Sequence, residues 1–462
     1  MFSDWSIPFV GALFYVAAVF VAFEAIRRTR TPQGAVGWTV FLFAWPLVAV
    51  PLYLLIGYSR VQSYAEARRE ADHGLPDGAE AALPPDAGPA ARLGTVGAVA
   101  LHPVTRGNSA RLLTDADAAF DAMLAAIDAA ERYVLLQSYI VRDDRIGRSF
   151  ADAMIRAAGR GVSVRMIVDA VGSLWLPRRY GNRLREAGVE LRFQRGPARP
   201  LGRFGLNFRN HRKILVIDGR EGFTGGLNLG VEYVGAWRDT QIALRGPLVQ
   251  QLQAQFLQDW YWVAGQRLDD DLIWTAAPEP DDMTGLVVGA SPTDPHDNGA
   301  LYFVALTQMA ERRLWIASPY FAPEPSVLNA IKLAALRGVD VRILVPEVPD
   351  KWLPWAAAFA FFDEVQSAGC EVWRYKPHFM HQKVALVDDD IASVGTFNLD
   401  IRSCLLNFET TVVLNDRRFA REVEAMLEAD FARSVRLDRT LAEAPVWLRI
   451  AAPVARLFAP VL

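Results

Sequence analysis

The stretch HRKILVID at residues 211–218 decides the fold, because it recurs 170 residues later as HQKVALVD at residues 381–388. Each copy is His-x-Lys, an apolar run and an aspartate. At the same offset the chain repeats a small pair followed by an asparagine, GGLN at 225–228 and GTFN at 395–398, and then an acidic residue. Polar positions that recur at one constant offset indicate a duplicated scaffold that carries chemistry.

The side chains of each motif suit phosphate chemistry. His and Lys two positions apart on a strand point to the same face, and the apolar run 214–217 is typical of a strand buried on both faces. We therefore expect His211 and Lys213 together at one strand end, and His381 and Lys383 at the equivalent end of the second copy. An imidazole can attack phosphorus or protonate a leaving oxygen, and Lys and Asn can donate to phosphate oxygens.

Two apolar runs, at residues 7–23 and 35–56, lie near the start of the chain. Each has about the 20 residues that cross a bilayer core, and the lack of a basic start argues against a cleaved signal peptide. We predict a two-helix transmembrane hairpin, with buried core helices as the alternative. The hairpin gives no orientation by the positive-inside rule, because equal numbers of arginines flank the second run: Arg27, Arg28 and Arg30 before it, and Arg60, Arg68 and Arg69 after it.

The spacing of the motifs resembles that of the phospholipase D superfamily, over roughly residues 109–435. The repeat extends upstream, where GVSVRMIV at 161–168 is similar to GVDVRILV at 338–345. Within the superfamily, the apolar hairpin, WRDT at 237–240 and NFE at 407–409 resemble the bacterial cardiolipin synthases. This resemblance implies that one phosphatidylglycerol transfers its phosphatidyl group to another through a phosphatidyl-histidine intermediate, giving cardiolipin and glycerol.

The resemblance also implies roles for the site residues. His211 is expected as the nucleophile and His381 as the general acid and base, a choice that the symmetry of the sequence cannot make. Glu409 is expected to orient His211, and Asp239 to orient His381, so that each pairing crosses the halves. The other expected site members are the motif lysines and aspartates and the phosphate-binding asparagines: Lys213, Lys383, Asp218, Asp388, Asn228 and Asn398. The two motif aspartates end apolar strands, which favours an anchoring role for them.

Neither a metal nor a cofactor is expected, because the remaining histidines at 73, 102, 296 and 378 show no metal-ligand spacing. The expected partners are phosphatidylglycerol and the bilayer, and the oligomeric state stays open. We expect a multi-pass protein of the bacterial inner membrane with its catalytic domain on the cytoplasmic side. Residues 178–213 are rich in arginine and predict either an electropositive approach for phosphate groups or a solvated charged face.

Several other activities share this chemistry. A hydrolytic phospholipase D would use water as the acceptor, and a related transferase would use serine or ethanolamine. A membrane-anchored nuclease, and nucleic acid as a partner, are disfavoured by the two apolar runs and the net charge of -3. A membrane scaffold with inactive repeats is disfavoured because both motifs are intact.

Helical and strand patterns alternate around the motifs and define the fold class. Such alternation predicts a mixed sheet between helices, twice over. The expected fold is therefore α/β, with two tandem phospholipase D-like α-β-α sandwich halves related by pseudo-twofold symmetry and preceded by the hairpin. We predict helices at 116–130, 147–160, 180–187, 248–264, 299–311, 326–337 and 355–368, and strands at 133–140, 163–169, 189–193, 313–318, 341–345, 371–375 and 383–388.

The expected domain order has five segments, at 1–58 (transmembrane hairpin), 59–108 (linker or collar), 109–275 (first half), 276–435 (second half) and 436–462 (amphipathic tail). The tail suits a helix that lies in the membrane interface, kinked at Pro453. The apolar segment 352–362 is too short to span a bilayer and predicts either a buried helix or a lip that admits acyl chains. Cys370 and Cys404 allow one bridge at most.

Overall fold

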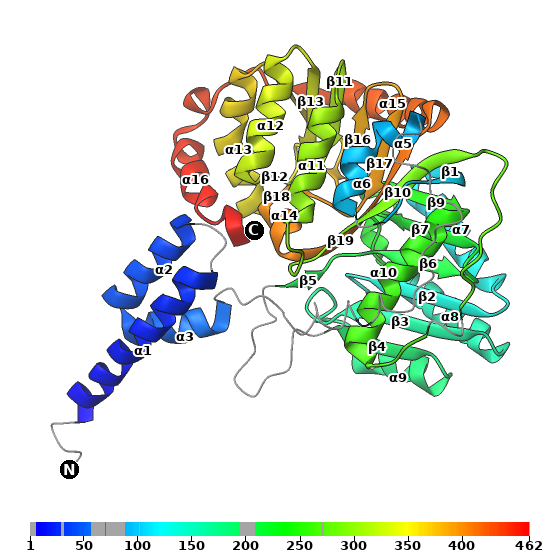
Figure 1. Ribbon diagram of the computed structural model, residues 1–462, viewed down its shortest axis with the longest axis horizontal. Coiled ribbons are helices and arrows are strands. Elements are labelled where there is room, and N and C mark those ends of the chain that lie inside the picture. Colours follow the sequence, from blue (N-terminus) through cyan, green and yellow to red (C-terminus); the bar gives the residue numbers. More distant parts are fainter. Residues whose placement is uncertain are drawn as a thin grey trace. The chain divides into compact units, whose positions relative to one another are not determined.

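The computed structural model describes residues 6–28, 32–56, 70, 88–100, 102–194, 208–268 and 272–461 (Figure 1). The chain forms two compact units. The first contains Met1–Glu66 and Arg195–Phe208, and the second contains Ala67–Gln194 and Arg209–Leu462. Two predicted segments lie at least partly outside the described residues. The parts that lie outside are residues 71–87 of the predicted linker and residues 195–207 of the arginine-rich stretch.

The first unit holds the two predicted apolar runs. Helix α1 (Ser6–Arg28) is, among the described residues, the one helix long and apolar enough to span a bilayer. The second run differs from the prediction, because it forms two shorter helices, α2 (Pro32–Ala44) and α3 (Pro46–Ile56). Pro46 has no backbone N–H and disfavours helical backbone at the preceding Trp45, so the helix stops there.

Small side chains let the three helices of this unit pack closely. Ala18, Ala22 and Ala25 of α1 pack in one cluster with Leu42 of α2 and Tyr53 of α3. Larger apolar side chains of α1 point away from this cluster and are exposed: Phe9, Leu13, Val16, Phe20 and Phe23. An apolar outer surface around a small-residue interface is typical of helices that pack within lipid.

The second unit is built on a 16-stranded mixed sheet (Figure 1). From the edge inward, the first half contributes β4 (Glu190–Gln194), β3 (Ser163–Asp169), β2 (Tyr133–Ser138), β6 (Ile214–Ile217), β7 (Glu221–Gly225), β9 (Gln241–Arg245) and β1 (Thr105–Leu113). The second half mirrors this order with β14 (Glu371–Tyr375), β13 (Asp340–Pro346), β11 (Arg313–Ala317), β16 (Val384–Val387), β17 (Ile391–Gly395), β19 (Asn407–Asn415) and β10 (Met283–Ala290). The edge strand β20 (Ser434–Arg436) lies beyond β14, and the sixteenth strand is β5 (Arg209–Asn210), which pairs with β19 off this path.

The two halves form one body. Strands β1 and β10 pair antiparallel at the centre, with Thr105 opposite Gly285. Two long helices, α10 (Pro247–Ala264) and α15 (Arg417–Ala432), share one apolar core with strands of both halves. The predicted pair of sandwiches is therefore confirmed as an architecture, although their sheets are continuous.

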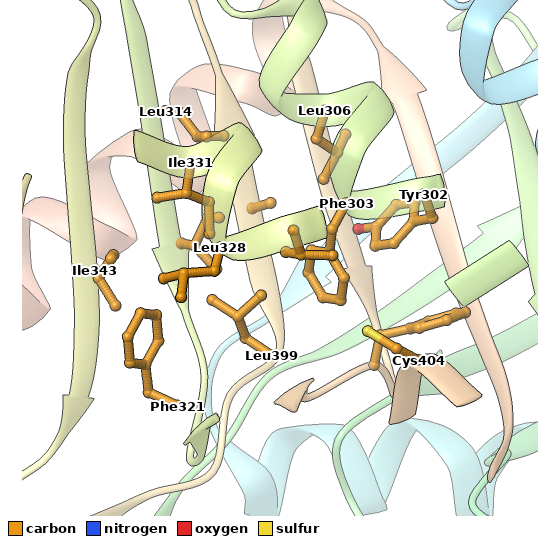
Figure 2. Close-up of a cluster of buried hydrophobic side chains, with 14 of the residues drawn as sticks. Tyr302, Phe303, Leu306, Leu314, Phe321, Leu328, Ile331, Ile343, Leu399 and Cys404 are labelled. Atoms are coloured by element: carbon orange, nitrogen blue, oxygen red, sulfur yellow. The ribbon is translucent and has the colours of Figure 1, made fainter. Parts of the chain in front are cut away.

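Helices on the other face of the sheet complete the sandwich. The first half is covered by α7 (Ala116–Asp128), α8 (Arg145–Gly159) and α9 (Arg178–Glu186), and the second by α11 (Asn298–Met309), α12 (Pro325–Leu336) and α13 (Trp352–Ser367). Figure 2 shows side chains of α11 and α12 gathered over Leu399 and Cys404. This core fixes the chain immediately after Asn398. Both cysteines are buried and free.

Several elements of the structure are missing from the sequence prediction. The central strands β1 and β10 were not predicted, because neither shows clear alternation. Strands β7, β9, β17 and β19 and helix α15 were also not predicted. Part of the predicted linker is ordered, since α5 (Gly88–Arg92) and α6 (Gly94–Ala100) place Leu93 and Val96 in the core of the second half. The five domain boundaries stay a prediction.

Candidate active site

Each motif histidine follows a two-residue strand that pairs with the opposite half. Strand β5 (Arg209–Asn210) precedes His211 and pairs in parallel with the start of β19. Strand β15 (Phe379–Met380) precedes His381 and pairs in parallel with β8 (Trp237–Arg238). The next residue of each partner segment is an acid, so the backbone brings each imidazole beside a carboxylate of the other half.

The imidazoles bond these carboxylates directly. Nδ1 of His211 lies 2.9 Å from Oε2 of Glu409, and Nδ1 of His381 lies 2.6 Å from Oδ2 of Asp239. All four side chains are buried. The structure thus brings together the pairs that the sequence resemblance implied. With Nδ1 held as a donor, Nε2 is the nitrogen that can attack phosphorus or exchange a proton.

Burial keeps both imidazoles neutral. It lowers the pKa of His211 to about 4, with Glu409 opposing the shift. Burial also lowers the pKa of His381 well below its ordinary value, and the charges of Lys383 and Lys213 add to the effect. A neutral imidazole with an oriented ring is ready to act as a nucleophile or a base.

The two carboxylates have different surroundings. Glu409 also accepts hydrogen bonds from the hydroxyls of Thr396 and Ser403 and from Nδ2 of Asn407. Burial raises its pKa, but His211, the charge of Lys213 and the Thr396 hydroxyl outweigh that effect, so the pKa of Glu409 lies below its ordinary value. Glu409 therefore stays ionised.

Asp239 has fewer donors. Besides His381, its carboxylate accepts the backbone N–H of Thr240 at 2.8 Å, and burial raises its pKa to about 6. Gly226 occupies the repeat position of Thr396, and a Cβ there would lie 1.9 Å from Oδ1 of Asp239. The glycine therefore makes room for this carboxylate and leaves it without a hydroxyl donor, so the two halves hold their histidines differently.

The motif lysines lie at the same strand ends. Nζ of Lys213 donates to the carbonyl of His211 at 2.8 Å, and Nζ of Lys383 donates to the carbonyl of His381. Burial lowers the pKa of Lys213 to about 7 and that of Lys383 to about 8. The ammonium of Lys383 lowers the pKa of Lys213 further, whereas Glu409 and Asp239 oppose the shift at both lysines. A phosphodiester anion would restore their charge, which suits a phosphate-binding role.

The asparagines have different partners. Nδ2 of Asn228 donates to the hydroxyl of Tyr233 at 2.5 Å, and its Oδ1 accepts the backbone N–H of Ile140 at 3.1 Å. Oδ1 of Asn398 is buried and has no hydrogen-bond partner among the described residues. Asn228 is thus already engaged in holding the site together, whereas the carboxamide oxygen of Asn398 can still accept a hydrogen bond from a ligand hydroxyl.

The motif aspartates lie at the far ends of their strands. The carboxylate of Asp218 accepts the backbone N–H groups of residues 131, 132 and 133 at 2.7 to 2.8 Å. Asp388 accepts those of residues 311, 312 and 313 and binds Nη2 of Arg92 at 2.5 Å. Each aspartate lies seven residues beyond the histidine of its motif. Along an extended chain this distance is roughly 20 Å, so neither carboxylate can touch the reacting atoms.

Sequence reasoning missed two buried aspartates that hold the middle residue of each motif. Nη1 of Arg212 donates to Asp259 on α10 at 3.0 Å, and Nε2 of Gln382 donates to Asp430 on α15 at 2.7 Å. The repeat offered a signal for them, because the two aspartates stand 171 residues apart, one position more than the motif offset of 170. They are positioning residues that hold the segment between His and Lys, which directly precedes the motif strand.

Aromatic side chains surround the imidazoles. The ring centroid of Tyr139 lies 5.0 Å from that of His211, and the centroids of Trp237 and Phe379 lie 5.3 and 5.8 Å from that of His381. Phe379 also lines a small pocket formed with residues such as Tyr320, Pro349, Lys351, Trp355 and Phe359. The segment 352–362 is therefore part of a largely buried helix that also borders a pocket beside the site.

The arginine-rich stretch is partly neutralised where it is described. Arg179 pairs with Asp143 at 2.8 Å, and Arg183 pairs with Asp152. Arg209 lies beside Tyr139 and lowers the pKa of its hydroxyl against the larger effect of burial. Among the described residues, no group of three or more His, Cys, Asp or Glu side chains is placed to hold a metal ion.

Solved structures share this fold. A phosphatidylserine synthase from Haemophilus influenzae superposes with a TM-score of 0.60 at 14% identity, covering 76% of this chain and 95% of that one. A polyphosphate kinase from Porphyromonas gingivalis superposes with a TM-score of 0.51 at 16% identity, covering 76% of this chain and 52% of that one. At these identities the likeness concerns the fold alone.

Sequence relatives define the family. Residues 123–260 and 303–431 match the model of the cardiolipin synthase, PLD-like domain. The chain is 43% identical to cardiolipin synthase A of Pseudomonas aeruginosa, over 92% of this chain and 89% of that protein. It is 37% identical to cardiolipin synthase A of Pseudomonas putida, over 100% and 99%. The chain belongs to the cardiolipin synthase family of the phospholipase D superfamily, which confirms the resemblance seen in the sequence.

Proposed function

We propose that the protein is a membrane-anchored phosphatidyltransferase that joins two phosphatidylglycerol molecules into cardiolipin and releases glycerol. Cardiolipin synthase activity follows from membership of the family. The observation that carries our site assignment is the pair of histidine–carboxylate bonds made across the halves. It places two imidazoles with unlike carboxylates in one buried site, as a two-step transfer requires.

His211 is the nucleophile in this proposal. Its Nε2 attacks phosphorus of the first phosphatidylglycerol, the bond from phosphorus to the glycerol oxygen breaks, and a phosphatidyl-histidine forms. Substituted His211 carries a positive charge, which the ionised Glu409 stabilises. The low pKa of Glu409, and the further donors Ser403 and Asn407 that hold its carboxylate, support this assignment.

His381 handles the proton. Binding of the anionic phosphodiester favours the charged ring of His381. This imidazolium protonates the departing glycerol oxygen, and the resulting neutral ring then removes the proton from the hydroxyl of the second phosphatidylglycerol. That oxygen attacks phosphorus, the bond to Nε2 of His211 breaks, and cardiolipin leaves. The raised pKa of its partner Asp239 supports a pair that shares a proton readily.

The remaining motif residues hold the phosphate and the scaffold. Lys213, Lys383 and Asn398 donate to phosphate oxygens as negative charge builds up on them. Nδ2 of Asn228 gives one hydrogen to Tyr233, and its second hydrogen donates to the phosphate in this proposal. Asp218 and Asp388 anchor the motif strands by binding backbone N–H groups.

The first unit anchors the enzyme in a bacterial inner membrane in this proposal. Helix α1 crosses the bilayer, and α2 and α3 together make the second crossing, since their 13 and 11 residues extend roughly 36 Å as helix. A proline break within a span is tolerated in membrane helices. A multi-pass hairpin leaves the second unit on one side, which we place in the cytoplasm.

Purified protein supplied with phosphatidylglycerol alone is expected to form cardiolipin and glycerol in equal amounts, resolved by lipid chromatography. Exhaustive chelation should leave the rate unchanged, because the lysines and carboxamides supply the phosphate donors. Phosphatidic acid as the main product would show that water is the acceptor. Loss of activity on chelation with rescue by one divalent ion would contradict the metal-independent mechanism.

A shortened chain that starts at Gly88 is expected to keep turnover in detergent micelles but to lose about tenfold or more on intact bilayers, where the anchor raises local substrate concentration. The start must precede Arg92, because this side chain binds Asp388 and the carbonyl of Met309. A matched chain starting at Thr95 lacks these bonds and should be less stable in thermal unfolding. Inactivity of the folded Gly88 chain in micelles would place the apolar helices inside the catalytic machinery.

A further inference from the structure

Two loops beside the histidines present apolar side chains to the solvent. The first follows β3 and exposes Leu174 and Trp175, whose exposed fractions are 66% and 80%. The second follows β13, the equivalent strand of the second half, and exposes Val348 and Trp352 at 48% and 52%. Both loops leave the sheet at the carboxyl ends of their strands, which is the end where the imidazoles lie.

The first loop is held rigidly against the site. Oδ1 of Asp169 accepts the backbone N–H groups of Val171 and Gly172 at 2.9 and 2.7 Å. The hydroxyl of Ser173 donates to the carbonyl of Tyr139 at 3.1 Å, and a Cβ on Gly172 would lie 2.4 Å from that carbonyl oxygen. Since Tyr139 packs on His211, the exposed Leu-Trp tip is fixed relative to the nucleophile.

The second loop is tied to the other histidine. Oδ2 of Asp350 accepts the hydroxyl of Tyr320 at 2.7 Å. Asp350 and Lys351 line one pocket with Phe379, whose ring centroid lies 5.8 Å from that of His381. The acids of this loop are paired, because Glu347 binds Arg374 at 2.8 Å. The pocket beside His381 opens between this loop and Tyr320.

We propose that these two loops form a membrane-docking surface that seats the site on a phospholipid bilayer. Tryptophan next to basic residues is typical of the membrane interface, and Arg178 and Lys351 flank the two exposed tips. Cations beside the tips match the negative charge of phosphatidylglycerol. A protein partner on this surface would block the lipid's path, so the occupant is the bilayer. The proposal rests on the phospholipid substrate of the proposed function, not on the roles given to individual site residues.

Labelled cysteines can test the surface in the full chain, because the native Cys370 and Cys404 are buried. Leu174→Cys and Val348→Cys carry an environment-sensitive fluorophore, and Ala129→Cys, exposed at the opposite edge of the first half, is the control. The proteins are reconstituted in vesicles of equal phosphatidylcholine and phosphatidylglycerol, with a nitroxide near the top of some acyl chains. We expect quenching of the labels at 174 and 348 and not at 129. Equal quenching at all three, or quenching at one loop alone, overturns the two-loop surface.

A pair of leucine variants supplies a kinetic readout. Leu174→Ser should lower turnover on vesicles about tenfold more than turnover of short-chain phosphatidylglycerol dissolved as monomers, because only the vesicle reaction needs docking. Leu336→Ser removes an equally exposed leucine at the end of α12 and should leave the ratio of the two rates unchanged. The same ratio in both variants would contradict docking through this loop. The fluorescence result does not depend on turnover, so failure of the proposed reaction and failure of this surface are told apart.

Discussion

Replacement of His211 or His381 by alanine is expected to reduce phosphatidylglycerol turnover by about a thousandfold or more, because groups of one catalytic unit fail together. In the proposed mechanism His211 provides the nitrogen that bonds phosphorus, so its loss should remove the intermediate. His381 is proposed to provide the proton for the leaving oxygen, so its loss should leave an alkoxide to depart unaided. Each carboxylate partner would also be left buried without its imidazole, and folding must therefore be verified by thermal unfolding.

The double variant distinguishes one site from two. Because both histidines act in one reaction, the double alanine variant should be little slower than either single one. His296→Ala is a matched control, since this histidine is exposed and lies outside the site, and its turnover should equal that of the unmodified protein. Losses that multiply in the double variant would show two independent sites. Incubation with labelled phosphatidylglycerol should yield a covalent lipid adduct in His381→Ala and none in His211→Ala.

Replacement of Glu409 by glutamine is expected to reduce turnover by about a hundredfold to ten-thousandfold with the fold intact. An amide in this place can donate to Nδ1 of His211, which moves the ring proton to Nε2 and blocks attack. It also cannot stabilise the positive charge of a substituted imidazole. The hydroxyl of Ser403 and Nδ2 of Asn407 both donate to Oε1. The oxygen of the glutamine therefore takes the place of Oε1, where it can accept these two hydrogen bonds, and its NH2 group faces His211.

The measurement compares kcat/KM and thermal unfolding with those of Glu311→Gln, a largely exposed glutamate outside the site. Turnover of folded Glu409→Gln close to that of this control would reduce Glu409 to a structural residue. The alanine variants of Ser403 and Asn407 should show a milder loss, because each removes one donor and leaves the carboxylate in place.

Much of the site could be predicted from the sequence because the repeat marks it twice. The offset of 170 residues identified the histidines, lysines, aspartates and asparagines together, and the apolar runs fixed the motif strands. The crossing of His211 to Glu409 came from the family resemblance rather than from the residues. Spacing along one chain cannot show which half supplies a partner.

Other features needed the fold. Thr396, Ser403 and Asn407 converge on Glu409 from separate positions of a turn, a short helix and a strand end, and no periodic pattern links them. The exposed tip at Trp175 looks like an ordinary apolar residue in the sequence. The break at Pro46 was visible in the sequence but was outweighed by the apolarity of the run around it.

The difference between Gly226 and Thr396 bears on why the two copies are joined in one chain. In an assembly of two identical chains, both histidines would share one carboxylate setting, and any mutation would alter the two alike. When the two copies are joined in one chain, a substitution in one copy leaves the other unchanged. Thr396 could then add a hydroxyl beside one carboxylate while Gly226 left the other poorly supplied with donors. The proposed division of labour between nucleophile and proton carrier therefore depends on covalent linkage, because symmetric halves could not maintain it.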